Sequence, residues 1–93
     1  MHILHILYVI QSKQYLSFYI GITSNLRKRL QEHNKGLVFS TKSKRPWILI
    51  YCEGYRSRED AKERERKLKK HRTAWIRIKE RIKNSLLLSP TKF

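Results

Sequence analysis

Apolar residues dominate the first half of the chain and fall into three short runs. Residues 3–11 are rich in Ile, Leu, Val and Tyr without polar alternation, which is typical of a strand covered on both faces. Residues 15–22 and 47–53 are predicted to form two further strands, and the first turn lies around residues 12–14. Within the third run, Cys52 is expected to be a small buried residue.

Three other segments show the spacing of helices. Residues 24–33 are predicted to be helical, with Thr23 or Ser24 as the N-cap. Residues 57–70 open with the spacing of a capping box, and a last helix is predicted over residues 73–84.

The order β-β-α-β-α-α in 93 residues predicts an α/β sandwich of the α+β type, in which helices flank a small three-stranded antiparallel sheet. We expect one domain over residues 1–84 and a C-terminal tail over 85–93, which either packs back on the domain or frays. The apolar start is too short to cross a bilayer and lacks the features of a signal peptide. A cytoplasmic protein without a membrane partner is therefore expected.

Basic residues greatly outnumber acidic ones, with 22 Lys and Arg against 7 Asp and Glu and a net charge of +15. Of these basic residues, 13 fall within residues 56–83. Such an excess destabilises a compact chain by self-repulsion, so we expect a polyanionic partner, nucleic acid first and an anionic membrane second. The alternative is a merely solvated basic face. The candidate phosphate-binding residues lie in a basic loop over 37–45 and around a helix junction: Lys42, Lys44, Arg45, Arg66, Lys69, Lys70 and Arg72.

Two tyrosines are expected to lie on one face of the first hairpin. If its turn is centred between Lys13 and Gln14, residues whose numbers sum to 27 lie opposite each other, which pairs Tyr8 with Tyr19. A slip of one residue would send one phenol to the other face. The alternative interpretation is that both are half-buried strand aromatics whose hydroxyls reach water.

Two cations border the apolar stripe of the first predicted helix. Arg29 and His33 lie at helical spacing beside Leu26 and Leu30, which must be buried. A cation in this position either extends outward along its stem or is directed at a ligand.

A carboxylate occupies the apolar stripe of the second predicted helix. Glu65 lies between Ala61 and Leu68, and burying it is costly unless it meets a cation, hydrogen-bond donors or a metal. An ion pair with Arg29 or another base is the alternative to a functional role. Three elements are thus expected to direct polar groups toward the sheet.

These residues resemble a known signature. Ile6-Leu7-Tyr8, followed after ten residues by Tyr19-Ile20-Gly21, resembles the paired motif of the GIY-YIG nucleases, with ILY in place of GIY. The segments GITSNLRKRLQEHN and AKERERKLKK are similar to the first helix and the glutamate helix of that family. The likeness covers about residues 3–84, and the chain closely resembles the small stand-alone members related to the N-terminal nuclease domain of UvrC.

The resemblance implies roles for five residues. Tyr8 and Tyr19 would be the signature phenols, Arg29 the catalytic arginine and His33 its neighbour. Glu65 would be the metal-binding carboxylate, holding one Mg²⁺ or Mn²⁺ while waters and substrate oxygens complete the coordination. A phenol is a poor base at neutral pH unless a cation or metal favours the phenolate.

The chain departs from the family pattern at two positions. Asn84 falls where many relatives have a late Asn, but Ser-Leu-Leu-Leu follows it here, so its role stays open. Ile22 stands where the repair nuclease has a lysine, so that positive charge is missing.

Three hypotheses about function follow. The first is a metal-dependent DNA endonuclease acting in DNA repair or recombination, a monomer or weak dimer whose specificity is supplied by a protein partner. The second is a non-catalytic nucleic-acid-binding module on the same scaffold. The third is an adaptor that uses the leucines of the tail, residues 86–88. The sequence leaves open whether flaps, branches or other DNA is cut, and which tyrosine is the base.

Overall fold

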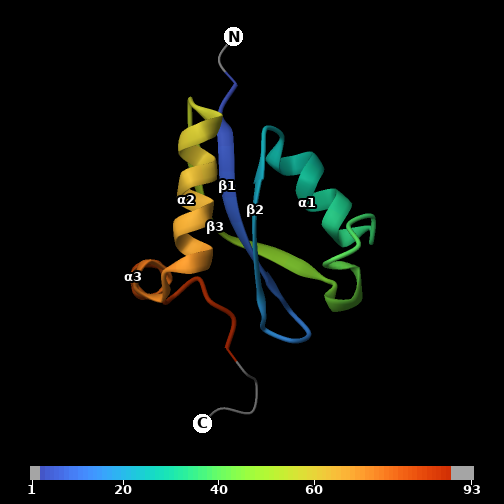
Figure 1. Ribbon diagram of the computed structural model, residues 1–93. Helices are drawn as coiled ribbons and strands as arrows, with labels where there is room; N and C mark the ends of the chain where they lie inside the picture. The colour runs from blue at the N-terminus through green and yellow to red at the C-terminus, as the bar shows by residue number, and fades with distance from the viewer. Residues whose placement is uncertain (1–2, 89–93) are drawn as a thin grey trace.

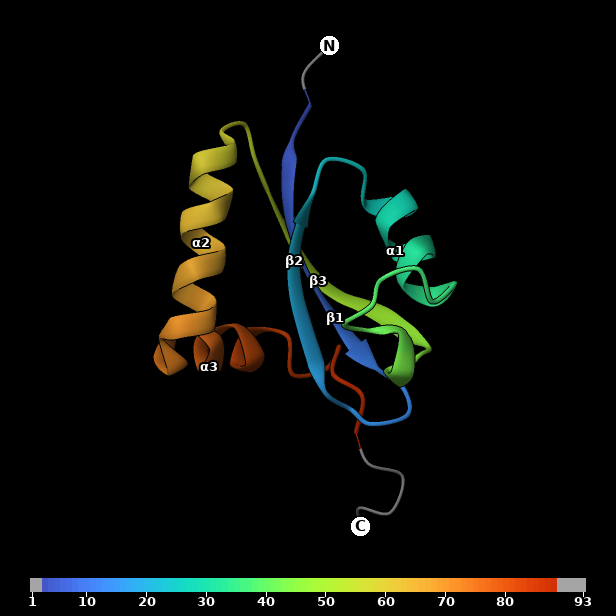
Figure 2. The same ribbon diagram turned by 45° about the vertical axis from the view of Figure 1, so that its right-hand side comes forward.

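A computed structural model describes residues 3–88, which form a three-stranded antiparallel sheet with helices on both faces (Figures 1 and 2). The α+β class and the element order predicted from the sequence are confirmed. No helix among these residues combines the length and apolar character that a membrane crossing requires. The elements are β1 (His5–Ser12), β2 (Phe18–Thr23), α1 (Leu26–Asn34), the short 3-10 helix η1 (Lys42–Lys44), β3 (Trp47–Tyr55), α2 (Arg58–Lys70) and α3 (Arg72–Arg81).

Strand β1 is the central strand, because the sheet has the order β2-β1-β3. Its residues from Leu7 to Ser12 are all buried, as the absence of polar alternation predicted. Successive side chains point to opposite faces, so this one strand contributes to two separate cores.

The two cores lie on opposite faces of the sheet, between the sheet and the helices that Figure 1 shows on either side of it. On the α1 face, Tyr8, Ile10 and Trp47 are buried and pack with partly buried side chains that include Leu26 and Leu30. The other face is covered by α2 and α3. Its core comprises Leu7, Val9, Ile50, Leu68 and Ile78.

The register of the first hairpin differs from the prediction. Tyr8 lies opposite Gly21, so paired residue numbers sum to 29 and not to 27, and Tyr8 is diagonal to Tyr19. The expected direct pairing is therefore wrong. The error is an even number of residues, which keeps both phenols on one face, with ring centroids 6.4 Å apart.

The connection between β1 and β2 explains the shift in register. The Ser12 N–H donates to the Ser17 carbonyl over 2.9 Å, which closes a wider loop than a tight turn at residues 12–14. Within it Leu16 adopts a positive φ of 62°. Consequently β2 begins only at Phe18.

Helix caps follow the chemistry of their side chains. The N-cap of α1 is Asn25, whose side-chain oxygen accepts from the Lys28 N–H at 3.1 Å, so the expectation of Thr23 or Ser24 is wrong. The N-cap of α2 is Ser57, as predicted, and it accepts from the Asp60 N–H. Helix α3 ends at Arg81, before the predicted end at residue 84.

Cys52 is exposed, so the expectation of a buried cysteine is wrong. It lies opposite Tyr8 on β3, which is an edge strand. Helix α1 has only nine residues, and it leaves part of this strand's surface open to solvent.

The first residues of the predicted tail pack back on the domain. Leu86 contacts the core under α2 and α3. The Leu87 N–H donates to the Gln11 side-chain oxygen at 2.8 Å, and the Gln11 amide donates to the Leu87 carbonyl at 3.3 Å. The remainder of the tail, residues 89–93, lies outside the described residues.

Candidate active site

One hollow of about 470 Å³ brings together four of the five predicted site residues. Tyr8 and Tyr19 reach it from β1 and β2, and Arg29 from α1. Glu65 lines the same hollow from α2, although α1 and α2 cover opposite faces of the sheet. The site therefore lies beside the edge strand β2, where both layers meet; in Figure 2 this strand is in front, between α2 and α1.

The Tyr8 ring lies directly over Gly21. Tyr8 is only 1% exposed, and a Cβ at Gly21 would lie 2.5 Å from the Tyr8 hydroxyl oxygen and 2.7 Å from its Cζ. Any side chain at Gly21 would therefore displace the phenol. Gly21 is thus required for the close approach of the Tyr8 ring to the backbone of β2.

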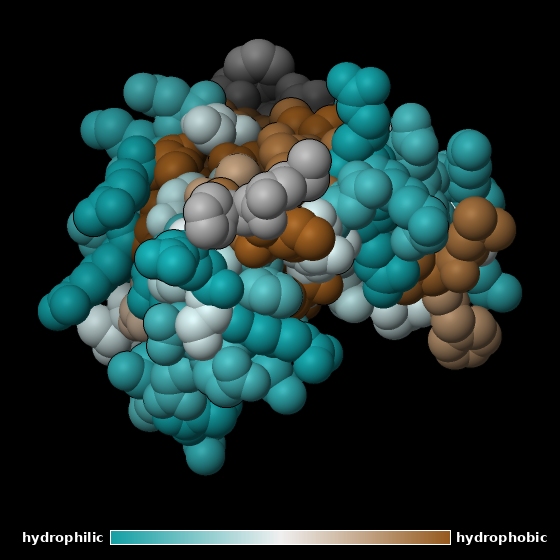
Figure 3. Space-filling view, turned by 90° about the horizontal axis from the view of Figure 1, so that it is seen from above, coloured by the Kyte–Doolittle hydropathy of each residue, from teal (hydrophilic) through white to brown (hydrophobic). Residues whose placement is uncertain are grey.

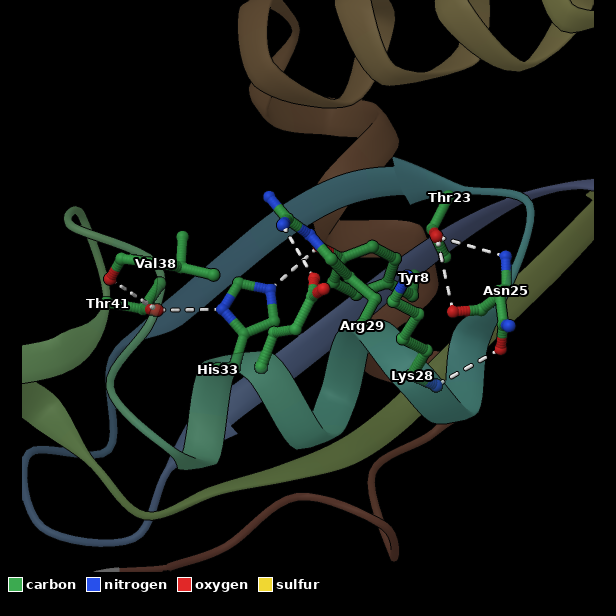
Figure 4. Close-up of polar contacts among 9 residues, drawn as sticks. Tyr8, Thr23, Asn25, Lys28, Arg29, His33, Val38 and Thr41 are labelled. Carbon is green, nitrogen blue, oxygen red and sulfur yellow. Dashed lines mark hydrogen bonds and ion pairs between the residues drawn. The ribbon is translucent and has the colours of Figure 1, made fainter.

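His33, which was expected beside the apolar stripe of α1, is completely buried and does not line the hollow. Its Nε2 lies 2.8 Å from the Tyr8 hydroxyl, and its Nδ1 lies 2.7 Å from the Thr41 hydroxyl (Figure 4). Thr41 is also completely buried. The imidazole therefore connects the site to the loop after α1, and it does not reach the solvent.

The hydrogen bonds define the state of His33. The Thr41 hydroxyl donates to the Val38 carbonyl at 3.4 Å and so accepts from the His33 Nδ1–H. Nε2 is then the acceptor, and the Tyr8 hydroxyl donates to it. Burial lowers the pKa of His33, and the nearby positive charge of Arg29 lowers it further, which favours this neutral imidazole.

The environment of Tyr8 favours its neutral phenol. Burial raises the pKa of Tyr8, the Arg29 guanidinium opposes that shift, and Tyr19 and Glu65 add to it. The Tyr19 ring contacts the His33 ring edge-on, with centroids 5.1 Å apart. The two phenols thus have different surroundings, because Tyr8 carries the hydrogen bond to the imidazole.

Arg29 provides a permanent positive charge at the hollow. Its guanidinium donates to Glu32 at 3.0 Å, one turn along α1, and its side chain is 35% exposed. The neighbouring Tyr8 hydroxyl and Glu32 carboxylate raise the pKa of Arg29. The sequence reasoning missed this contact with Glu32, although the i, i+3 spacing of the two residues was visible.

Glu65 lies at the edge of the inward stripe of α2. Ala61 and Leu68 are buried as predicted, whereas the Glu65 side chain remains 25% exposed. Its carboxylate forms an ion pair with Lys69 at 3.0 Å. The alternative of an ion pair with a base therefore holds in this structure, with Lys69 and not Arg29 as the partner.

The donor set at the hollow fits a weakly held hard cation. Residues 3–88 contain no group of three or more His, Cys, Asp or Glu side chains placed to hold a metal ion. Among the described residues, Glu65 is the only acidic residue that lines the hollow. A single carboxylate suits Mg²⁺ or Mn²⁺ when waters and phosphate oxygens supply the other ligands.

Two further cations line the hollow and were missed by the sequence reasoning. Arg58 and Lys62 project from α2 into the same space as Glu65. Their spacing of four and then three residues places all three on one helical face, which was the available signal. Ile22, which carries no charge, also lines the hollow, so these cations add positive charge where that position has none.

None of the seven predicted phosphate-binding residues lines the hollow. The first group follows α1 and the second surrounds the α2–α3 junction, and all seven are exposed. In the second group Arg66 pairs with Glu63 at 2.7 Å, and Lys69 pairs with Glu65. Asn84, whose role was left open, is exposed and also lies outside the lining of the hollow.

Comparisons with known proteins agree with the geometry. The family model described as the GIY-YIG catalytic domain matches residues 4–81. A UPF0213 protein of Pediococcus pentosaceus is 39% identical over 77 residues, covering 82% of this chain and 80% of its own length. One from Staphylococcus haemolyticus is 37% identical over 67 residues, covering 70% and 79% respectively.

One of the other relatives is matched over a shorter stretch. A UPF0213 protein of Desulfotalea psychrophila is 43% identical over 56 residues, which are 57% of this chain and 50% of that relative. No solved structure matches the chain. The family match spans β1 through α3, including both tyrosines, Arg29 and Glu65. This chain therefore belongs to the GIY-YIG family of nuclease domains.

Proposed function

We propose that the protein is a metal-dependent endonuclease that hydrolyses phosphodiester bonds in DNA. The observation that supports this proposal is the meeting of two phenols, a guanidinium and a carboxylate in one hollow. These groups match the needs of the reaction, which are an activated water and stabilisation of negative charge on the phosphate. The net charge of +15 favours a polyanionic substrate.

Arg29 is proposed to bind the scissile phosphate. Its guanidinium stays charged at every relevant pH and donates to Glu32 through one nitrogen, so further N–H donors are available. Two parallel donors to a phosphate fix its orientation as well as its charge. Arg58 and Lys62 would hold the same phosphate or its neighbour from the α2 side.

Tyr8 is proposed as the general base. The sequence alone left open which of the two tyrosines has this role. As a water in the hollow attacks phosphorus, its proton passes to the Tyr8 oxygen while the Tyr8 proton passes to His33 Nε2. The new P–O bond forms as the bond to the leaving oxygen breaks, and that oxygen departs with the electron pair and takes up a proton from solvent. Tyr8 then stays neutral throughout, which its raised pKa favours, and the buried imidazole carries the proton.

Glu65 is proposed to hold the divalent ion. A bound Mg²⁺ or Mn²⁺ would neutralise charge that develops on the phosphate and leaving oxygens. The Lys69 ammonium forms an ion pair with this carboxylate and would have to move away before a metal ion could bind. Lys69 is itself exposed on α2, so its side chain can turn to solvent or to a DNA phosphate.

Cleavage assays test the proposal. Plasmid, flap and branched DNA would be incubated with Mg²⁺ or Mn²⁺, and we expect nicking that EDTA abolishes. Glu65→Gln should reduce the rate on the order of 100-fold or more. Glu63→Gln is the matched control, since this acid is on the same helix and does not line the hollow. Absence of cleavage under all these conditions, or cleavage that survives Glu65→Gln, would refute the proposal.

A non-catalytic DNA- or RNA-binding module on the same scaffold is the second candidate. It is favoured by the Glu65–Lys69 ion pair, which leaves the carboxylate already neutralised. Salt-sensitive binding without any metal-stimulated cleavage would support this function.

The biological setting is also a proposal. We infer that the protein processes branched or flap DNA during repair or recombination in the cytoplasm, as a monomer or weak dimer, with a protein partner supplying specificity. The small size of the described domain, in which one hollow brings the two phenols, Arg29 and Glu65 together, motivates the need for such a partner. Sedimentation of the purified chain and co-purification with a tagged copy would test the oligomeric state and the partner respectively.

A further inference from the structure

The loop that follows α1 presents two large apolar side chains to solvent. Leu37 is 70% exposed and Phe39 is 85% exposed. Figure 3 shows apolar side chains projecting from hydrophilic surroundings on the right-hand side, which is the side of α1 in Figure 1. We call residues 35–45 the aromatic loop. The exposed phenyl ring offers apolar area that a ligand gains by covering.

The aromatic loop is held firmly, so the exposure of its ring does not arise from loose chain. Thr41 is completely buried, and its carbonyl accepts from the Trp47 indole N–H at 2.9 Å. The Ser12 hydroxyl donates to the Lys44 carbonyl at 2.7 Å. The ring of Phe39 thus projects from a backbone that is anchored on the sheet.

The exposed ring belongs to a basic segment of the chain. The aromatic loop contains Lys35, Lys42, Lys44 and Arg45 and no acidic residue. The Lys42 ammonium lies over one side of the Phe39 ring, 5.0 Å from its centroid. A ligand that matches this surface has a flat apolar face next to negative charge, which describes an unpaired nucleotide.

We propose that Phe39 stacks against an unpaired base, so that the preferred DNA contains a single-stranded or branched segment beside the cleavage position. In a continuous duplex both faces of a base are already stacked on its neighbours. An exposed phenyl ring therefore gains contact only where a base is free. The cations of the aromatic loop would hold the phosphates on either side of that base.

The position of the ring connects this surface to the candidate active site. Phe39 is two residues from Thr41, a span of at most ~7 Å of chain. The Thr41 hydroxyl contacts His33, and His33 contacts the Tyr8 hydroxyl (Figure 4). An unpaired base on Phe39 would thus lie within a few nucleotides of the hollow, an inference that rests on the proposed nuclease function.

Binding measurements without catalysis test this proposal. A fluorescein-labelled duplex with a five-nucleotide unpaired segment and a fully paired duplex of equal length would be titrated in EDTA at fixed salt. We expect Phe39→Ala to weaken binding of the unpaired substrate by about tenfold and binding of the duplex by less than twofold. Phe39→Trp should preserve the preference. Tyr15→Ala is the matched control, because Tyr15 is another exposed aromatic, at 57%.

Three results would overturn the proposal. Equal weakening on both substrates would mean that Phe39 acts without regard to unpaired bases, and unchanged binding would mean that it contacts no DNA. A concentration-dependent dimer that Phe39→Ala abolishes would assign the ring to a contact between copies of the chain. Because EDTA removes any metal-dependent cleavage, failure of the proposed nuclease activity leaves this test intact.

Discussion

Replacing Gly21 by alanine should damage both stability and the candidate active site. An added Cβ would lie 2.5 Å from the Tyr8 hydroxyl oxygen, 2.7 Å from Cζ and 3.0 Å from Cε1. These atoms belong to a buried ring whose hydroxyl is fixed by His33. The phenol cannot swing into solvent without leaving the core on the α1 face.

The cost follows from two contributions. Overpacking a well-packed site by one methyl costs about 1–3 kcal/mol. Moving the Tyr8 hydroxyl away from His33 loses a buried hydrogen bond and leaves Nε2 unpaired, at a cost of about 1–3 kcal/mol. We therefore expect Gly21→Ala to lower the free energy of unfolding by about 2–5 kcal/mol, since some strain relaxes into the solvent-filled hollow.

Urea denaturation with a double-mutant cycle measures this effect. Gly54→Ala is the control in the same sheet, because its Cβ would meet only the flexible Leu4 side chain, at 3.0 Å. Tyr8→Leu removes the ring, and in that background Gly21→Ala should cost less than about 1 kcal/mol. The change should appear in the denaturation midpoint at constant slope.

Two outcomes would refute the reasoning about Gly21. The first is a loss of stability no greater than that of Gly54→Ala. The second is an equal loss of stability with and without the Tyr8 ring. That result would mean that Gly21 is needed for its backbone conformation and not for the close approach of Tyr8. DNA binding in EDTA should change little in Gly21→Ala, while cleavage should fall with the displaced phenol.

Three further predictions concern proton positions and buried charge. Tyr8→Phe should reduce cleavage at saturating DNA far more than Tyr19→Phe, because only the Tyr8 hydroxyl donates to His33; equal losses would contradict the assignment of the base. The pKa of His33 is held below 6.5, so the unfolded chain binds a proton first, and stability should fall as pH drops through 6.5 toward that lowered value. His33→Asn should flatten this decline in urea melts taken between pH 5 and 8. Burial opposes ionisation of Glu53, but hydrogen bonds from Arg64 and two tyrosines hold its pKa below 4.5. Glu53→Gln should therefore cost about 1–3 kcal/mol at pH 7 and less below pH 4, without altering DNA cleavage.

Sequence patterns were sufficient to predict how the helices and the sheet are layered. The unbroken apolar run of β1 indicated a strand covered twice, and the structure places it between α1 on one face and α2 with α3 on the other. The serine of the capping box marked the start of α2 because an N-cap is a local contact between neighbours in sequence. Spacing along each helix likewise placed Ala61 and Leu68 inside.

Features that depend on tertiary contacts were harder to predict. The predicted register of the hairpin was wrong because a positive φ at Leu16 widens the loop. No Gly or Asn marks that position in the sequence. The sequence left open whether the His33 side chain extends outward or is directed at a partner, and only its tertiary contact with Thr41 decides between the two. Arg58 and Lys62 were passed over because their charges resembled those of an ordinary solvated helix.

Building the hollow from both layers has a consequence during synthesis of the chain. The phenols and Arg29 belong to the first 34 residues, whereas Glu65 arrives with α2, which packs on the opposite face. A nascent or partly unfolded copy that has lost either layer lacks one half of the proposed chemistry. The proposed cutting of DNA would thus begin only once α2 has docked on the sheet.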